Sequence, residues 1–126
     1  MTLRIALAAL LSASLLAAAA PGTADAADAK QQFNLRGLGA FTCAKYLEDR
    51  RTDIKGTEIY AHWFTGFLTG YNFLQPDTFE IAPSHDAKGL LTYLDIYCAK
   101  NPQLTVGVAA TAFVKAVYDK RQVSSK

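Results

Sequence analysis

The sequence predicts an all-α protein built as a small four-helix domain with one disulfide. Hydrophobic residues recur at helical spacing in four segments, which Gly and Pro residues separate. No alternating run of β-branched residues is long enough to indicate a sheet. The two cysteines, Cys43 and Cys98, stand in the first and third segments. These three observations favour a cross-linked bundle of helices.

The first two predicted helices run from Cys43 to about Arg51 and from Glu58 to about Leu74. Thr42 and Thr57 precede them, and threonine is a favoured N-cap because its hydroxyl accepts from a free backbone N–H. Gly56 breaks the chain between the helices. One side of the first helix carries Cys43, Tyr46, Leu47 and Arg50.

On a helical projection, the second predicted helix divides into a polar stripe and an aromatic face. The polar stripe contains Glu58, His62, Thr65, Thr69 and Asn72. The aromatic face contains Tyr60, Phe64, Phe67, Leu68, Tyr71 and Leu74. Gly66 and Gly70 lie on one flank, at a spacing that lets helices approach closely. We expect a close contact with another helix there, with a backbone kink or a dimer seam as the alternatives.

The third predicted helix begins at Ser84 or Asp86 and runs to about Lys100. It ends there because the next residue, Asn101, precedes a proline and therefore avoids helical geometry. Its apolar face contains Ala87, Leu90, Leu91, Leu94, Tyr97 and Cys98.

A fourth helix and a long loop complete the predicted elements. The helix runs from Val106 to about Arg121, with Thr105 as its N-cap. One face carries Val106, Ala110, Phe113, Val114 and Val117, and further alanines keep its surface small. The loop spans residues 75–85, and we expect Phe79 and Ile81 to attach it to the body of the domain.

Residues 1–26 have the layout of a secretory signal peptide. Arg4 precedes an apolar run, and small residues suited to cleavage follow near Ala26. The alternative is a membrane anchor, but the run of about 16 residues is shorter than the roughly 20 that a spanning helix needs. We therefore expect cleavage and export to the periplasm. A flexible leader (residues 27–40), a helical domain (41–121) and a disordered tail (122–126) would follow.

The composition of the mature chain indicates how it is stabilised and which classes of partner are not expected. Two cysteines in an exported protein are more often joined than free, so Cys43 and Cys98 are expected to form a disulfide. The full chain has 13 basic and 11 acidic residues, and removal of Arg4 and Asp25 with the signal peptide leaves 12 and 10, again a formal charge of +2. This balance is unlike that of a nucleic-acid-binding surface. No later segment resembles a membrane span.

The sequence contains no constellation typical of an enzyme. It has two histidines and no Gly-rich phosphate loop, metal-ligand cluster or GxSxG turn, so we expect no catalytic residues, metal or cofactor. His85 and Asp86 are interpreted as part of a polar loop. Glu58 and His62 stand at i and i+4 and are candidates for a pH-responsive pair, with a solvated surface pair as the simpler interpretation.

Two segments resemble the HdeA/HdeB acid-stress chaperones, and the second is most similar to the HdeB branch. They are "FTCAKYL" at residues 41–47 and "YLDIYCAKNPQLTV" at residues 93–106. The resemblance implies a periplasmic helical protein with a Cys43–Cys98 disulfide that is dimeric and inactive near neutral pH. In acid it would hold unfolded periplasmic proteins on an apolar surface. The implied surface contains Trp63, Phe64, Phe67, Leu68 and Tyr71.

The segment "WFTGFLTGYN" at residues 63–72 resembles other proteins more closely than it does the best-known chaperones. It is similar to broader HdeA/HdeB-like relatives, and to the GY-x-x-G segment of Tai-like periplasmic immunity proteins. Those proteins block secreted peptidoglycan amidases and usually carry further cysteines that this chain lacks. The resemblance implies an alternative function, in which the chain binds one folded partner such as a cell-wall hydrolase.

Overall fold

The computed structural model describes residues 27–30 and 32–125, and the predicted signal peptide lies outside this range. All the helices described belong to one compact unit that begins at Asn34. In chain order they are η1 (Gly37–Ala40), α1 (Cys43–Thr52), α2 (Glu58–Leu74), α3 (Ala87–Lys100), α4 (Val106–Val117) and η2 (Tyr118–Lys120), where η denotes a 3-10 helix. The described residues thus contain four α-helices and no strand, which confirms the all-α prediction.

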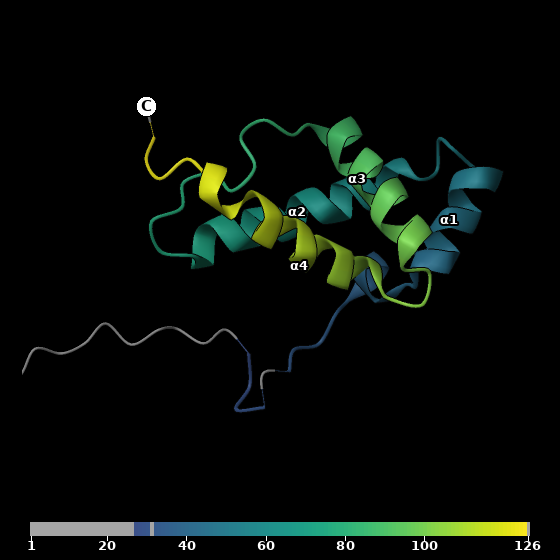
Figure 1. Ribbon diagram of the computed structural model, residues 1–126, viewed down its shortest axis with the longest axis horizontal. Helices are drawn as coiled ribbons and strands as arrows, with labels where there is room; N and C mark the ends of the chain where they lie inside the picture. The colour runs from purple at the N-terminus through teal and green to yellow at the C-terminus, as the bar shows by residue number, and fades with distance from the viewer. Residues whose placement is uncertain (1–26, 31, 126) are drawn as a thin grey trace, which may run out of the picture. The chain divides into compact units, whose positions relative to one another are not determined.

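Helix α3 occupies the centre of the unit because it contacts α1, α2 and α4. In Figure 1, α1 lies at one end of the unit beside α3. The predicted disulfide is present: Cys43, the first residue of α1, is bonded to Cys98 in the last turn of α3, and their Cα atoms are 4.8 Å apart. Both cysteines are completely buried. The cross-link therefore fixes one end of α1 to the central helix.

Two of the three predicted threonine N-caps are confirmed, and of the two possible starts of the third helix, Ser84 and Asp86, Asp86 is the cap. The side chains of Thr42, Asp86 and Thr105 each accept a hydrogen bond from a backbone N–H of the first turn. Thr57 is the exception, since its backbone is helical and its side chain makes no capping bond. Its hydroxyl instead donates to the carbonyl oxygen of Ile54 at 2.6 Å. Thr57 is buried, and its hydroxyl stabilises the loop before α2 instead of capping the helix.

The packed unit begins earlier than the sequence pattern indicated. Residues 34–40 were assigned to a flexible leader, yet Gly37–Ala40 form η1, which contacts α2 and α4. The indole Nε1 of Trp63 donates to the carbonyl oxygen of Arg36 at 3.0 Å, and Gly39 is buried against the same ring. Gly37 and Gly39 give this segment the composition of a flexible leader, yet their lack of a side chain allows the backbone to approach Trp63.

The end of the chain also differs from the prediction. Helix α4 ends at Val117, and η2 replaces its expected last turn. Gln122, assigned to the disordered tail, forms an antiparallel bridge with Glu80. The N–H of Gln122 donates to the carbonyl oxygen of Glu80 at 2.8 Å, and the N–H of Glu80 donates in return at 3.1 Å. This bridge ties the C-terminal segment to the loop between α2 and α3.

Phe113 of α4 is the centre of an aromatic cluster in the core. The rings of Phe64, Tyr93 and His85 each meet it edge to face, with centroids 4.9–5.3 Å away. Ile81 is fully buried, so this part of the predicted loop attachment is confirmed. Phe79 is 54% exposed, and its predicted attachment is wrong.

The predicted close contact at Gly66 and Gly70 is also wrong. A Cβ atom built on either glycine meets no atom within 4 Å, and both residues are exposed. Close approaches of distant segments occur at Gly39, against Trp63, and at Gly107, against Leu35, and Gly56 lies close to its neighbour Asp53. In the part of the chain that the structure describes, no helix is both long and apolar enough to cross a bilayer.

Candidate functional site

Helix α2 carries most of the candidate site residues and has three distinct faces. One face packs into the core, a second lines a groove beside α3, and a third is exposed and partly apolar. The polar stripe predicted from the sequence is the face that lines the groove. The glycine flank is the exposed face.

The aromatic residues predicted as a client surface lie mostly inside the unit. Phe64 and Leu68 are buried, and Trp63, Phe67 and Tyr71 are half-buried against the core. The ring of Trp63 stacks on that of Phe67, with centroids 5.8 Å apart. A client can reach these side chains only after the segments that cover them have moved.

The exposed face of α2 contains Ile59, Gly66, Gly70 and Phe73. They fall within about 60° on a projection of about 100° per residue. The Ile59 side chain is 53% exposed and that of Phe73 is 87% exposed. Because nothing lies near the two glycines, this face is open to another helix.

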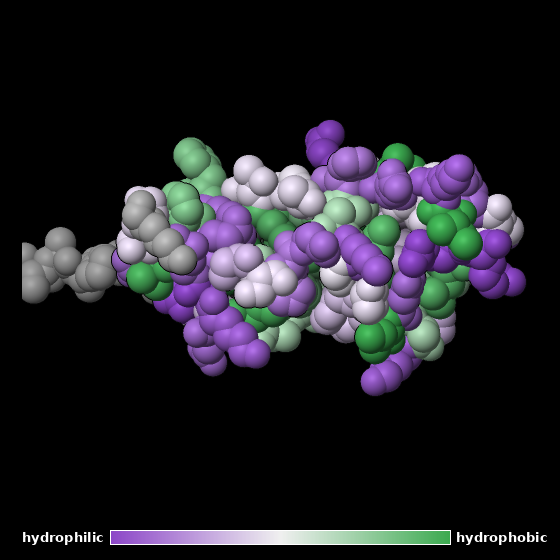
Figure 2. Space-filling model, turned by 90° about the horizontal axis from the view of Figure 1, so that it is seen from above, coloured by the Kyte–Doolittle hydropathy of each residue, from purple (hydrophilic) through white to green (hydrophobic). Residues whose placement is uncertain are grey.

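A second exposed apolar region lies at the C-terminal end of α2. Phe73, Leu74 and Phe79 are exposed there, as is Val123, which follows the residue paired with Glu80. In Figure 2, hydrophobic and hydrophilic residues are interspersed over the visible face of the helical unit. That face therefore presents small apolar regions and no single dominant patch.

Two adjoining hollows form the groove along the polar stripe, and Ala87 of α3 borders both. The first has a volume of about 280 Å³ and is lined by Thr65, Thr69 and Asn72. The second, of about 400 Å³, is lined by Glu58 and His62. The sequence thus predicted a shared polar face, while the groove itself depends on the position of α3.

Glu58 and His62 share a wall of the second hollow but form no ion pair with each other. Both side chains are exposed, and the ion pairs found among the described residues are Lys45–Asp49 and Arg50–Asp95. Lys88 and Leu91 of α3 line the same hollow. The predicted i, i+4 pair is therefore not made in this structure.

The acid-sensitive contacts that the sequence did not reveal join α1 to α3. The guanidinium group of Arg50 donates two hydrogen bonds of 2.9 and 2.8 Å to Asp95, one to each carboxylate oxygen. The buried phenol of Tyr46 donates to the same carboxylate at 2.7 Å. Burial of Asp95 favours its neutral form, but the bonds from Arg50 and Tyr46 outweigh that effect and lower its pKa.

A similar contact joins α1 to α2. The carboxylate of Asp49 accepts from Lys45 within α1, and from the buried phenol of Tyr60 at 2.7 Å. The bond from Lys45 and then that from Tyr60 lower the pKa of Asp49. Burial, together with the bonds to the carboxylates, raises the pKa values of Tyr46 and Tyr60. Both phenols therefore stay protonated and serve as fixed donors.

One signal for these contacts was present in the sequence. Arg50 was placed on the same side of its helix as Cys43 and Tyr46, and a cation on a buried side needs a counter-ion. The counter-ion, Asp95, lies 45 residues away in the sequence. Helical periodicity gives no information on such a distant pairing.

The chain was compared with protein-family models, curated proteins and solved structures. None of these matches it.

Proposed function

We propose that this chain is a periplasmic acid-stress chaperone-like protein. At neutral pH the side chains of Trp63, Phe64, Phe67 and Tyr71 are packed in or against the core, and in strong acid they become available to unfolded client proteins. The observation that carries this proposal is the attachment of α1 through two tyrosine–carboxylate contacts, Tyr46–Asp95 and Tyr60–Asp49.

Protonation of these carboxylates weakens the attachment in two ways. A neutral carboxyl group no longer balances Lys45 or Arg50, and its hydrogen bonds lose their charge-assisted strength. Because the pKa values of Asp49 and Asp95 are lowered in the folded state, the stability they supply is complete above about pH 4. It is lost as the pH falls through their folded-state pKa values. The transition is thus expected in strong acid.

Loosening of α1 would expose apolar surface without releasing the helix. Tyr46 and Tyr60 meet edge to face with centroids 4.9 Å apart, and both are buried between α1 and the rest of the unit. The Cys43–Cys98 disulfide keeps α1 tethered to α3. Removal of Arg4 and Asp25 with the signal peptide leaves 12 basic and 10 acidic residues. Discharge of these acidic residues leaves the basic residues and two histidines unopposed, and their repulsion favours expansion.

The exposed face of α2 supports a homodimer at neutral pH. Gly66 and Gly70 allow the α2 helices of two copies to cross closely, and Ile59 and Phe73 would be covered on either side. A symmetric pair of this kind uses the same surface on both copies. Acid would then act on the protomer fold and on the dimer together.

Suppression of client aggregation tests the proposed activity. An acid-denatured client is followed by light scattering between about pH 2 and pH 4, and an apolar dye reports exposed surface on the protein alone. We expect reduced scattering and increased dye fluorescence, both beginning below about pH 4. Full client aggregation together with unchanged dye fluorescence would rule out the proposal.

A matched variant links the activity to the two contacts. Asp49→Asn combined with Asp95→Asn replaces both charges at nearly constant size, so α1 should loosen at neutral pH and dye binding should no longer require acid. Glu58→Gln, which removes an exposed carboxylate outside these contacts, serves as the control. Equal acid dependence of dye binding in both variants would show that other groups control the transition.

The second candidate function is an immunity or inhibitor protein that binds one folded partner. The apolar end formed by Phe73, Leu74, Phe79 and Val123 supports it, because these side chains are exposed without any change in the fold. Aromatic side chains are common binding hot spots. The test is a pull-down from periplasm at neutral pH with wild type and with Phe73→Ser. A stoichiometric partner captured by the wild type alone would favour this function over the first.

A further inference from the structure

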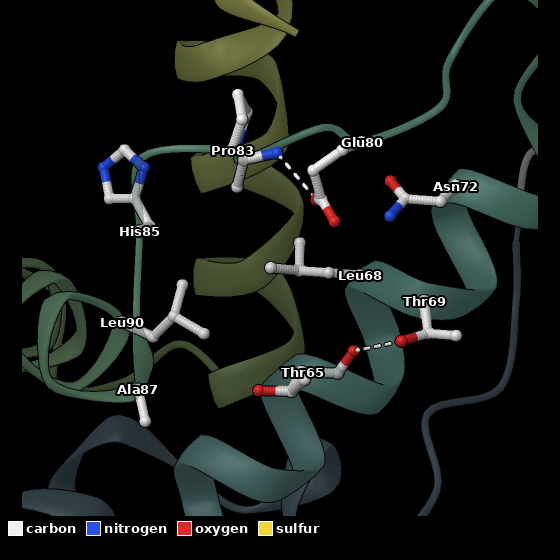
Figure 3. A pocket seen from close by; sticks show the side chains of 10 residues that line it. Thr65, Leu68, Thr69, Asn72, Glu80, Pro83, His85, Ala87 and Leu90 are labelled. Carbon is white, nitrogen blue, oxygen red and sulfur yellow. Dashed lines mark hydrogen bonds between the residues drawn. The ribbon is translucent and has the colours of Figure 1, made fainter. Parts of the chain in front are cut away.

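The first hollow of the groove is built around a fixed carboxylate. Figure 3 shows Glu80 directed into it from the loop between α2 and α3, opposite His85 and above Leu68. Both backbone polar groups of Glu80, its N–H and its carbonyl oxygen, are bonded to Gln122. One carboxylate oxygen, Oε1, accepts from the N–H of Ala82 at 3.0 Å. The side chain is therefore positioned before any ligand arrives.

Two further side chains of the hollow present hydrogen-bond acceptors. The hydroxyls of Thr65 and Thr69 donate to carbonyl oxygens of their own helix at 2.8 and 2.9 Å, so their oxygen lone pairs face outward. The Oδ1 atom of Asn72 accepts from the N–H of Ile81 at 2.9 Å, so the acceptors of the hollow are Glu80 and the two threonines, while Asn72 keeps its NH₂ group as a donor. A ligand that supplies several donors suits such a site.

No cation of the described residues neutralises Glu80. The ion pairs that these residues form use Asp49 and Asp95, and the Arg121 side chain donates to the carbonyl oxygens of Asp77 and Tyr118. The second oxygen, Oε2, has no hydrogen-bond partner among the described groups. The hollow thus has an available negative charge.

The floor of the hollow is apolar. Leu68 and Leu90 are buried beneath it, and Ala82 closes one side. A volume of about 280 Å³ admits a short alkyl chain with its polar head. Charge, acceptors and apolar floor together define the ligand chemistry.

We propose that this hollow binds an alkylammonium group, with its NH₃⁺ on Glu80 and Thr69 and its methylenes against Leu68 and Leu90. A lysine side chain of a partner protein and a free small amine both carry this group. The proposal is independent of the acid-stress function, since it concerns the folded protein near neutral pH.

Amide NMR titration of the oxidised protein at pH 8 tests the proposal. The probes are n-butylammonium chloride and, as matched controls, n-butanol and sodium butyrate. We expect saturable shifts of the Ile81 and Ala82 amides with n-butylammonium alone. Equal shifts with butanol, or shifts that never saturate, would overturn the proposal.

Two variants distinguish binding at this site from non-specific attraction of cations to the protein. Glu80→Gln keeps an oxygen for the Ala82 N–H but removes the charge, and Glu58→Gln removes a carboxylate from the adjoining hollow. We expect binding of n-butylammonium to weaken about ten-fold in Glu80→Gln and to stay unchanged in Glu58→Gln. Equal affinities of the two variants would overturn the assignment.

A blocked lysine tripeptide distinguishes the two sources of the group. Tighter binding of the peptide than of n-butylammonium would indicate that the hollow takes a lysine of a partner protein. Tighter binding of n-butylammonium would indicate a free amine as its ligand. Absence of saturable binding by both probes would overturn the proposal.

Discussion

The indole ring of Trp63 covers Gly39 so closely that a Cβ atom at this position would lie 2.0 Å from the ring carbon Cζ2. Segment 34–40 therefore docks on α2 through a residue that must lack a side chain. By contrast, Gly66 and Gly70, three and seven residues further along α2, have open space around them. The sequence pattern suggested that glycine is required within α2, at Gly66 and Gly70. In the structure it is required at Gly39, which lies outside that helix.

Gly39→Ala is expected to destabilise the protein, and Gly66→Ala is expected to stabilise it. The first change forces Trp63 or η1 to move, at a cost of about 1 to 3 kcal/mol. The second removes a flexible residue from an exposed helix interior and gains roughly 0.5 to 1 kcal/mol. Urea unfolding in dilute solution, followed by fluorescence of the sole tryptophan, measures both. A loss of stability in Gly66→Ala would indicate a contact that the isolated chain does not show.

Tyr46→Phe should lower stability more at neutral pH than in acid. The phenol donates to a charged carboxylate at pH 7, and loss of such a bond costs about 1.5 to 3 kcal/mol. Once the pH falls below the lowered pKa of Asp95, its carboxyl is neutral, so the same deletion removes a weaker bond. Unfolding free energies of wild type and variant at several pH values provide the test.

Tyr93→Phe is a matched control for that measurement. Tyr93 also packs in the aromatic core, but it has no hydrogen bond to a carboxylate among the described groups. Its substitution should change stability by a similar amount at both pH values. If Tyr46→Phe behaved in the same pH-independent way, the Tyr46–Asp95 contact would have no part in the acid transition.

Removal of the disulfide should be strongly destabilising. The bond closes a loop of 55 residues, for which the chain-entropy model gives about 4 kcal/mol. Cys43→Ala combined with Cys98→Ala adds the cost of small cavities, because both sites are completely buried. The measurement compares urea midpoints of the variant, the reduced wild type and the oxidised wild type. Equal midpoints for oxidised and reduced wild type would contradict the expectation.

Local signals predicted the helices well, because caps, periodicity and proline act over a few residues. The sequence predicts Thr42 and Thr105 as N-caps and Ser84 or Asp86 as the start of the third helix, and the structure has capping bonds at Thr42, Asp86 and Thr105. The spacing of buried residues likewise identified Cys43 and Tyr46 on one side of α1. These features depend on neighbours within one helical turn.

Features that depend on distant parts of the chain could not be predicted. Gly39 is needed because of Trp63, and Gln122 is ordered by its bridge to Glu80. The hollow around Glu80 likewise exists only because α3 lies beside the polar stripe of α2. A single sequence contains no periodic pattern that reports these pairings.

Substitution on the exposed face of α2 should separate the protomers if two copies pair there. We expect Gly66→Gln to elute as a monomer at pH 7 in gel filtration, because a long side chain blocks the close crossing of helices while helix propensity improves. Ala116→Gln, on the exposed side of α4, is the control and should elute with the wild type. The wild type should itself shift to a smaller size near pH 3. Elution of the wild type as a monomer at pH 7 would exclude this dimer and leave the face of α2 free for a different protein.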